Sequence, residues 1–373
     1  MATINTHAAI ARAPHIGWEL TDLQLDDPKE HEVRIRFAAS GLCHSDDHIT
    51  AGDAPVRMPV VGGHEGAGIV ESIGPNVRRV KVGDRVVCSY IPACGACRPC
   101  STGHQNMCVK GLNAGTGMFL DGTYRFHKDG EDLGGFCSLG TFSQYAVVSE
   151  WAVVPLADDI PFEIASLVGC GVPTGWGSAV YAAGVKAGDT AVIFGAGGVG
   201  SNAVQGARYA GAKNVIVVDP VEFKRENAMR FGATHTFADP KEAHDFVNAT
   251  TWGQLAEHVI LTPGVVTEEM VQQAVLMTGK GGKVTITAVG HLKEKAVHVH
   301  AGLLIGYQRQ IRGALFGDCN PLYDIPKLLG LYRSGDLKLD ELVTRTYALD
   351  EVNDAYRDLN AGKNIRGVIV HDS

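Results

Sequence analysis

The sequence has no apolar run approaching the roughly 20 residues that a membrane-spanning helix needs. Residues 1–20 contain no long apolar core of the kind found in secretion signals. The chain also lacks internal repeats, blocks of like charge and low-complexity linkers. Its formal net charge of −8 speaks against nucleic acid and anionic membranes as partners. We therefore expect a cytoplasmic protein with no nucleic-acid or membrane partner.

The length and composition indicate two globular domains. A chain of 373 residues is too long for one ordinary hydrophobic core. Hydrophobic residues make up 45% and charged residues 20%, which is usual for a globular protein.

The strongest motif lies within residues 191–219, where Gly-Ala-Gly-Gly-Val-Gly follows a short apolar run and precedes a helix-like segment. Gly195 permits a tight turn, Gly197 lets the backbone approach a pyrophosphate, and Gly200 lets the helix pack close to the strand. The free N–H groups and positive dipole end of that helix would bind phosphate. Asp219 ends the next apolar run, where its carboxylate would accept hydrogen bonds from ribose hydroxyl groups. The stretch predicts a dinucleotide-binding unit.

A second motif is a cluster of four cysteines, Cys94, Cys97, Cys100 and Cys108. Four thiolates at this spacing can converge on one tetrahedral ion and leave no position open for a substrate, which is typical of structural zinc. An iron–sulfur cluster is the alternative, because close cysteine triplets also bind such clusters. Disulfides are less expected in a cytosolic protein of this size. We favour structural zinc.

The chain before the glycine motif reads as mainly β. Val33, Ile35 and Phe37 alternate with Arg34 and Arg36, the pattern of a half-buried strand.

Two further segments, SGLCHSDDH at 40–48 and GGHEGAG at 62–68, carry groups that can ligate metal or transfer protons. The glycine-rich stretch 111–140 is predicted to be a long loop over this domain, framing the substrate entrance.

After Asp219, strands and helices alternate, which predicts a doubly wound parallel sheet and an α/β fold. We expect the tail from about residue 315 to complete the first domain, which makes that domain discontinuous. The predicted boundaries are 1–171 for the catalytic domain, 172–314 for the cofactor domain and 315–373 for the return, with a structural zinc lobe at about 90–112.

Several motifs in their order along the chain resemble the zinc-dependent medium-chain alcohol dehydrogenases. They are GLCHSD with Cys43, GGHEGAG, the four-cysteine cluster, GCGVPTGWG with Cys170, GAGGVG, and Lys363 to Arg366 near the end. IPACGACRPCSTGHQN, DGTYRF, VDPVEFKRE and LKLDEL add a closer similarity to the nicotinoprotein alcohol dehydrogenases, which are assayed with N,N-dimethyl-4-nitrosoaniline. The resemblance implies a Rossmann cofactor domain and a GroES-like catalytic domain.

The resemblance also implies two Zn²⁺ ions per chain, one structural and one catalytic. Cys43, His64 and Cys170 would ligate the catalytic ion, an arrangement that leaves one position open. Glu65 would be a transient fourth ligand or lie just behind the ligands, and Asp46 would hydrogen-bond His64 and fix its ring.

By the same resemblance, Ser45 would accept the substrate proton and His48 would pass it towards solvent through the nicotinamide ribose. The glycine loop would hold the pyrophosphate, and other residues would contact the rest of NAD. The implied cofactor residues are Gly195, Gly197, Gly198, Val199 and Gly200 of the loop, Asp219 and Lys224 at the adenosine ribose, Arg366 and His44 at the pyrophosphate, Val289 and Phe316 at the carboxamide, and Thr174 at the ring. Many relatives carry arginine at the position of His44, so its phosphate role is a departure from the family pattern.

The implied activity is the reversible oxidation of alcohols to aldehydes by hydride transfer to NAD. NAD would stay tightly bound and be reoxidised in place by a second acceptor such as mycofactocin, in a homodimer or homotetramer. Two alternatives are an ordinary alcohol dehydrogenase with exchangeable NAD and a thiol-dependent formaldehyde dehydrogenase. A non-enzymatic binding protein is disfavoured because Cys43, His64 and Cys170 are all present.

Overall fold

The computed structural model describes residues 3–290 and 296–372. The chain divides into two compact units. The first, here the β unit, comprises Met1–Cys170, Asn320–Arg333 and Leu339–Ser373. The second, the α/β unit, comprises Gly171–Cys319 and Ser334–Lys338. No helix among the described residues is long and apolar enough to cross a membrane.

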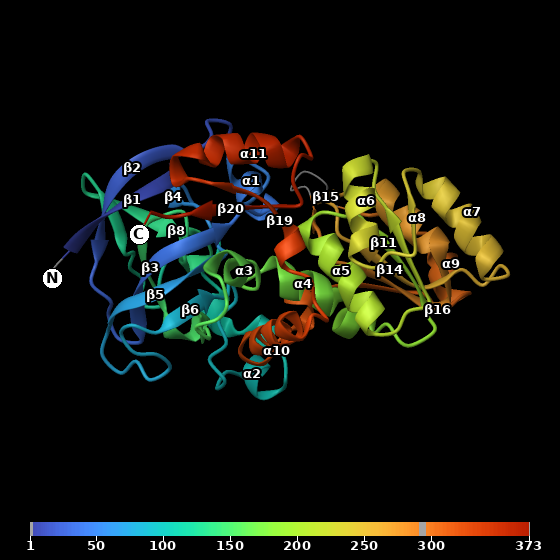
Figure 1. Cartoon of the computed structure of the whole chain (residues 1–373), viewed down its shortest axis with the longest axis horizontal. Coiled ribbons are helices and arrows are strands. Elements are labelled where there is room, and N and C mark those ends of the chain that lie inside the picture. Colours follow the sequence, from blue (N-terminus) through green and yellow to red (C-terminus); the bar gives the residue numbers. More distant parts are fainter. Residues whose placement is uncertain (1–2, 291–295, 373) are drawn as a thin grey trace. The chain divides into compact units, whose positions relative to one another are not determined.

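The β unit contains a closed barrel and a second sheet (Figure 1). The barrel has the order β1-β2-β7-β8-β4: β1 (Thr3–Ala11), β2 (Glu19–Asp26), β7 (Phe126–Lys128), β8 (Glu131–Gly135) and β4 (Val60–Val61). The seven-stranded sheet has the order β10-β6-β5-β3-β20-β19, with β9 also paired to β3: β10 (Val153–Pro155), β6 (Arg85–Cys88), β5 (Gly66–Ile73), β3 (Glu32–Gly41), β20 (Arg366–Val370), β19 (Val343–Tyr347) and β9 (Tyr145–Ser149). Its helices are α1 (His44–Thr50), α2 (Arg98–Ser101), α3 (Phe162–Leu167), most of α10 (Pro321–Ser334) and α11 (Val352–Asn360).

The strand β3 has the burial that its sequence predicts. Val33, Ile35 and Phe37 are buried, while Arg34 and Arg36 are half-buried. The C-terminal strand β20 pairs with β3 in an antiparallel register, with Val368 opposite Gly41. The end of the chain therefore supplies strands to a sheet whose other strands come from the first 155 residues.

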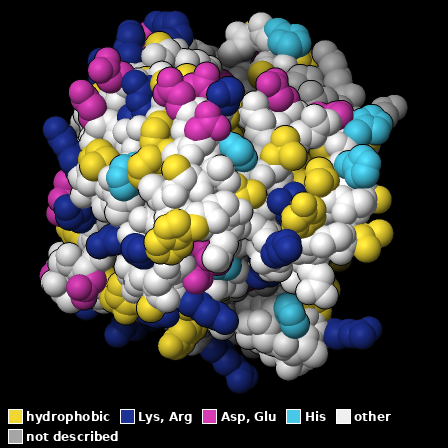
Figure 2. Space-filling model, turned by 90° about the vertical axis from the view of Figure 1, so that its right-hand side faces the viewer, with side chains coloured by type: hydrophobic (Ala, Val, Ile, Leu, Met, Phe, Trp, Pro, Cys, Tyr) yellow, Lys and Arg dark blue, Asp and Glu magenta, His cyan; other side chains and the backbone are white. Residues whose placement is uncertain are grey.

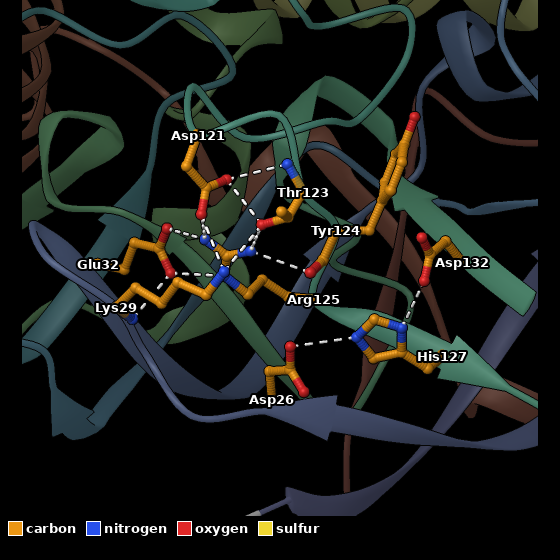
Figure 3. A network of polar contacts seen from close by, with 9 residues as sticks. All are labelled: Asp26, Lys29, Glu32, Asp121, Thr123, Tyr124, Arg125, His127 and Asp132. Atoms are coloured by element: carbon orange, nitrogen blue, oxygen red, sulfur yellow. Dashed lines mark hydrogen bonds and ion pairs between the residues drawn. The ribbon is translucent and has the colours of Figure 1, made fainter. Parts of the chain in front are cut away.

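The prediction of a long loop over 111–140 is wrong for the second half of this stretch. That half forms β7, β8 and a 3-10 turn at Phe136–Ser138. A buried ion pair orders the segment just before β7, because the Arg125 guanidinium donates to both carboxylate oxygens of Glu32 at 2.7 and 2.5 Å (Figure 3). Arg125 also donates to Asp121, which pairs with Lys29. The many glycines of this segment favoured a loop prediction. The ion pair could not be predicted from the sequence, because its partner Glu32 is 93 residues away.

The α/β unit is built on a six-stranded parallel sheet with the order β13-β12-β11-β14-β16-β18 (Figure 1). The strands are β11 (Thr190–Phe194), β12 (Asn214–Val218), β13 (His235–Phe237), β14 (Ala256–Leu261), β16 (Thr278–Ile286) and β18 (Gln310–Gly313), and β15 (Val265–Val266) pairs separately with β17 (Val289–Gly290). The helices are α4 (Gly171–Gly177), a π-helical turn at Ser178–Ala183, α5 (Gly198–Tyr209), α6 (Glu222–Arg230), α7 (Pro240–Thr250), α8 (Glu268–Met277) and α9 (Ala301–Ile305). The alternation confirms the predicted doubly wound α/β fold.

Candidate metal centres and cofactor site

Four side chains of the β unit form the first candidate metal centre. Cys43 precedes α1, His64 and Glu65 lie between β4 and β5, and Cys170 follows α3. One ligand atom of each lies within 4.8 Å of the others. Two sulfurs that share a zinc ion at about 2.3 Å are roughly 3.8 Å apart in tetrahedral geometry. The donor set of two thiols and one imidazole therefore fits Zn²⁺.

The two thiols of this centre are hydrogen-bonded to each other. A hydrogen bond from Cys170 lowers the pKa of the Cys43 thiol well below its usual value, against the effect of burial. The same bond, together with burial, raises the pKa of Cys170. A bound cation would stabilise both sulfurs as thiolates.

His64 is oriented by a buried carboxylate. Its Nδ1 lies 2.9 Å from Oδ2 of Asp46, whose Oδ1 accepts the Gly63 N–H at 2.8 Å. Asp46 and His64 are both buried. With Nδ1 facing the carboxylate, Nε2 is the atom left for a metal, the usual arrangement for a histidine ligand.

Glu65 pairs with Arg366, which comes from β20 at the other end of the chain. Both side chains are buried. Burial raises the pKa of Glu65 to about 7, and the Arg366 guanidinium opposes this rise. Arg366 Nε has no hydrogen-bond partner among the described residues. The structure thus brings Arg366 to the first metal centre.

Ser45 and His48 both lie on α1. The Cys43 thiol lies 3.6 Å from Ser45 Oγ. His48 is buried, and its Nδ1 lies 3.6 Å from Asp53 Oδ2. Residues three apart on a helix share a face, so the two side chains project from one side of α1.

Three aromatic residues at this centre carry no sequence signal. Phe136 and Tyr90 meet the His64 ring edge-on, with centroids 5.2 and 5.8 Å away. Tyr356 donates its hydroxyl hydrogen to the carbonyl oxygen of Cys43 at 3.3 Å. Burial raises the pKa of Tyr356 well above its usual value. These three aromatic side chains contact His64 and Cys43, and the sequence alone does not indicate these contacts.

The second candidate metal centre contains Cys94, Cys97, Cys100 and Cys108, whose sulfurs lie within 4.8 Å of one another. The backbone N–H of Cys97 donates to Cys94 Sγ, and that of Cys94 donates to Cys108 Sγ, both at 3.4 Å. Hydrogen bonds from the backbone of Cys100 and Val109 lower the pKa of Cys97 to about 6. All four cysteines are free thiols. Such a closed set of four sulfurs fits a structural zinc ion.

The glycine motif of the α/β unit has the geometry of a phosphate-binding turn. Gly195 has φ +90°, and a Cβ on Gly200 would lie 1.9 Å from the Gly195 carbonyl oxygen. Gly197 is the N-cap of α5, and a Cβ there would meet nothing within 4 Å. The turn therefore needs Gly195 and Gly200 for its own packing, while Gly197 leaves open space at the helix N-terminus, where a pyrophosphate would fit. Gly198 and Val199 form the first turn of that helix.

Asp219 supports this turn at the end of β12. Its Oδ2 accepts the Ala196 N–H at 2.8 Å, and its Oδ1 accepts the Val221 N–H at 2.9 Å. Each carboxylate oxygen has a second lone pair, so both can still accept from a ribose.

The other predicted cofactor residues lie on several elements. Thr174 on α4 is buried, and its Oγ1 has no hydrogen-bond partner among the described residues. Phe316 is buried with φ +56°. The rest are Lys224 on α6, Val289 on β17 and, in the β unit, His44 at the start of α1.

Comparison with known proteins gives two matching family models. Residues 29–158 match the alcohol dehydrogenase GroES-like domain, and residues 198–334 match the zinc-binding dehydrogenase model. The NDMA-dependent alcohol dehydrogenase of Amycolatopsis methanolica is 52% identical over 370 residues, which are 99% of this chain and 100% of that protein. A putative alcohol dehydrogenase D of Mycobacterium tuberculosis is 53% identical over 368 residues, with 99% and 100% coverage.

Among solved structures, the benzyl alcohol dehydrogenase of Acinetobacter calcoaceticus is similar, with a TM-score of 0.91 and 31% identity over 99% of this chain and 100% of that one. The fold that contains both candidate metal centres and the glycine turn is therefore the same as in that structure over nearly the whole chain. The chain belongs to the zinc-containing medium-chain alcohol dehydrogenases, oxidoreductases that act on CH–OH groups.

Proposed function

We propose that this chain is a nicotinoprotein alcohol dehydrogenase, in which NAD stays bound while a second molecule removes the hydride. The observation that carries the proposal is the 52% identity over the full length of an enzyme named NDMA-dependent. An enzyme that passes hydride to an added acceptor has no need to release NADH in each turnover. The physiological acceptor is a redox carrier such as mycofactocin, and the substrates are alcohols and aldehydes.

Cys43, His64 and Cys170 would hold the catalytic zinc ion. When bound, this ion would polarise the alcohol oxygen as a Lewis acid, and NAD would accept the hydride from the carbinol carbon. Ser45, 3.6 Å from the Cys43 sulfur, would accept the hydroxyl proton, and His48 on the same helix would carry it onward.

Asp46 and Arg366 would hold the ligands in place. Asp46 keeps the His64 ring in one orientation, and Arg366 keeps Glu65 beside the thiols. As a buried carboxylate that lies within 4.8 Å of the ligand atoms, Glu65 would act as the transient fourth ligand.

In the α/β unit, the glycine turn 195–200 would bind the pyrophosphate and Asp219 with Lys224 the adenosine ribose. Arg366 and His44 of the β unit would add positive charge at the pyrophosphate. Thr174, Val289 and Phe316 would contact the nicotinamide. We also propose a homodimer or homotetramer in the cytoplasm, where nine free thiols remain reduced.

The test is the nucleotide content of protein purified without added NAD. We expect about one NAD(H) released per chain on denaturation, ping-pong kinetics with an alcohol and N,N-dimethyl-4-nitrosoaniline, and little stimulation by free NAD⁺. Slow dissociation explains this retention, since affinity differences among related complexes arise mostly from the dissociation rate. Protein that emerges empty and needs added NAD⁺ would instead be an ordinary alcohol dehydrogenase.

A further inference from the structure

A hollow of about 340 Å³ lies in the α/β unit, away from both metal centres in the sequence. Its lining includes Trp252 just before β14, Glu257 near the start of β14, Lys280 near the start of β16, and Tyr307 and Arg309 just before β18. The strands β14, β16 and β18 are adjacent and parallel. The amino ends of these strands therefore lie at the same end of the sheet. The glycine turn follows the carboxyl end of β11 and so lies at the opposite end. The hollow is separate from the proposed cofactor site.

Arg309 is a buried charged group of this hollow. It is only 9% exposed, and its Nε and Nη1 are buried without a hydrogen-bond partner among the described residues. Its guanidinium carbon lies 4.6 Å from the centroid of the Tyr307 ring. Burial without a carboxylate partner lowers the pKa of Arg309. A buried guanidinium that lacks acceptors is costly, so an acceptor from outside the chain would stabilise it.

The other charged side chains around the hollow leave it electropositive. The Lys280 ammonium lies 5.7 Å from the centroid of the Tyr307 ring, on the same ring that Arg309 contacts. The acid in the lining, Glu257, accepts the Thr190 N–H at 2.8 Å through Oε2. Two cationic side chains and one carboxylate therefore line the hollow.

The hollow also offers aromatic surface. Tyr307 is 40% exposed, and Trp252 is 85% exposed. Trp252 has φ +53°, and Leu255, which also lines the hollow, has φ +66°. Non-glycine residues in the left-handed region are uncommon and gather at functional sites. On the face drawn in Figure 2, hydrophobic side chains are scattered in small groups.

We propose that this hollow is a second ligand site, which binds a small aromatic anion, a ring bearing a phosphate or a carboxylate. Arg309 and Lys280 bind the anionic group, and Tyr307 and Trp252 stack on the ring. The hollow volume lies in the range of small-molecule sites. The Arg309 guanidinium, whose Nε and Nη1 have no acceptor among the described residues, would donate a charge-assisted hydrogen bond to such a group.

The experiment titrates phenyl phosphate into the purified holoenzyme by calorimetry, with inorganic phosphate and phenol as comparison probes. Trp252 fluorescence reports on the ring. We expect one phenyl phosphate per chain, quenched fluorescence, and weaker binding of both comparison probes. Arg309→Gln should weaken binding at least about tenfold, because a charge-assisted hydrogen bond is lost. Arg230→Gln, which removes an exposed arginine of the same unit, should leave binding unchanged.

Lys280→Gln and Trp252→Leu provide a second test at exposed positions, should Arg309→Gln fail to fold. Lys280→Gln should weaken the binding of phenyl phosphate more than the binding of phenol. Trp252→Leu should remove the fluorescence change that accompanies the binding of phenyl phosphate. Arg309→Lys should restore part of the affinity. The proposal is overturned if the wild-type holoenzyme binds no phenyl phosphate, or if binding is equal in wild type and in whichever of the Arg309 and Lys280 variants fold.

Discussion

Replacing Asp219 with asparagine tests the cofactor assignment at one functional group. The substitution removes the charge while the side chain keeps its size. In the folded chain the two carboxylate oxygens accept the N–H groups of Ala196 and Val221. An asparagine amide has one acceptor oxygen, so one of these bonds is lost as well. The variant should therefore loosen the glycine turn and weaken the contact with the ribose.

The two effects can be separated by comparing NAD with NADP. A hydrogen bond to a charged group contributes about 1.5–3 kcal/mol, so loss of the ribose contact should weaken NAD about 10- to 150-fold. A loosened glycine turn should weaken the binding of NAD and of NADP by the same factor. The lost carboxylate, however, no longer repels a 2′-phosphate, so the preference for NAD over NADP should fall at least about tenfold.

The measurements are the NAD(H) content of the purified variant and the dissociation constants of both cofactors for stripped protein, followed by cofactor fluorescence. Glu222→Gln is the matched control, because Glu222 is an exposed acid in the first turn of α6. The assignment is refuted if Asp219→Asn and Glu222→Gln retain the same NAD preference, or if the wild-type protein binds NADP as well as NAD.

Three further predictions concern the metals and the fold. Metal analysis should find two Zn²⁺ per chain; Cys97→Ala should lose one and melt earlier, while Cys43→Ser should keep its melting point and lose about 10²–10³-fold in kcat, and a single zinc or iron–sulfur absorbance in the wild type would contradict this. Arg125→Met should lower the unfolding free energy by about 3–5 kcal/mol because it leaves Glu32 charged and buried, and adding Glu32→Gln should recover most of that loss; an undiminished denaturation midpoint would argue against it. Burial lowers the pKa of His371 to about 4, so the folded state stays neutral while the unfolded chain takes up a proton below about pH 6.5; stability should fall by about 2 kcal/mol from pH 7 to 5, and His371→Gln should lack this part of the pH dependence.

One of the two candidate metal centres can be predicted from residue spacing alone, and the other cannot. The four cysteines of the closed centre lie within Cys94–Cys108, so their spacing alone indicates a common ion. Cys43, His64 and Cys170 are spread over three connections of the β unit, and each alone looks like an ordinary buried residue. Only the resemblance to a family grouped them, and the folded chain then brings their ligand atoms together.

Long-range pairs explain what the sequence could not indicate. Arg366 and Glu65 are 301 residues apart, and their contact depends on β20 joining the sheet beside β3. Likewise, Arg125 orders the segment before β7 only because Glu32 lies at the start of β3. Periodicity reports which face of a strand is buried, but it contains no information on the strand order that creates such pairs.

Arg309 shows what the structure adds beyond any motif. Its neighbours Gln308 and Gln310 are ordinary polar residues, and a lone arginine between two such residues is typical of a surface charge. In the folded chain the side chain is buried against Tyr307, with two donors that meet no acceptor among the described residues. An arginine stays charged under nearly all conditions, so this cost cannot be relieved by losing a proton. Either the rest of the fold offsets the cost in every molecule, or a bound anion removes it, and only the second case makes binding of phenyl phosphate depend on Arg309.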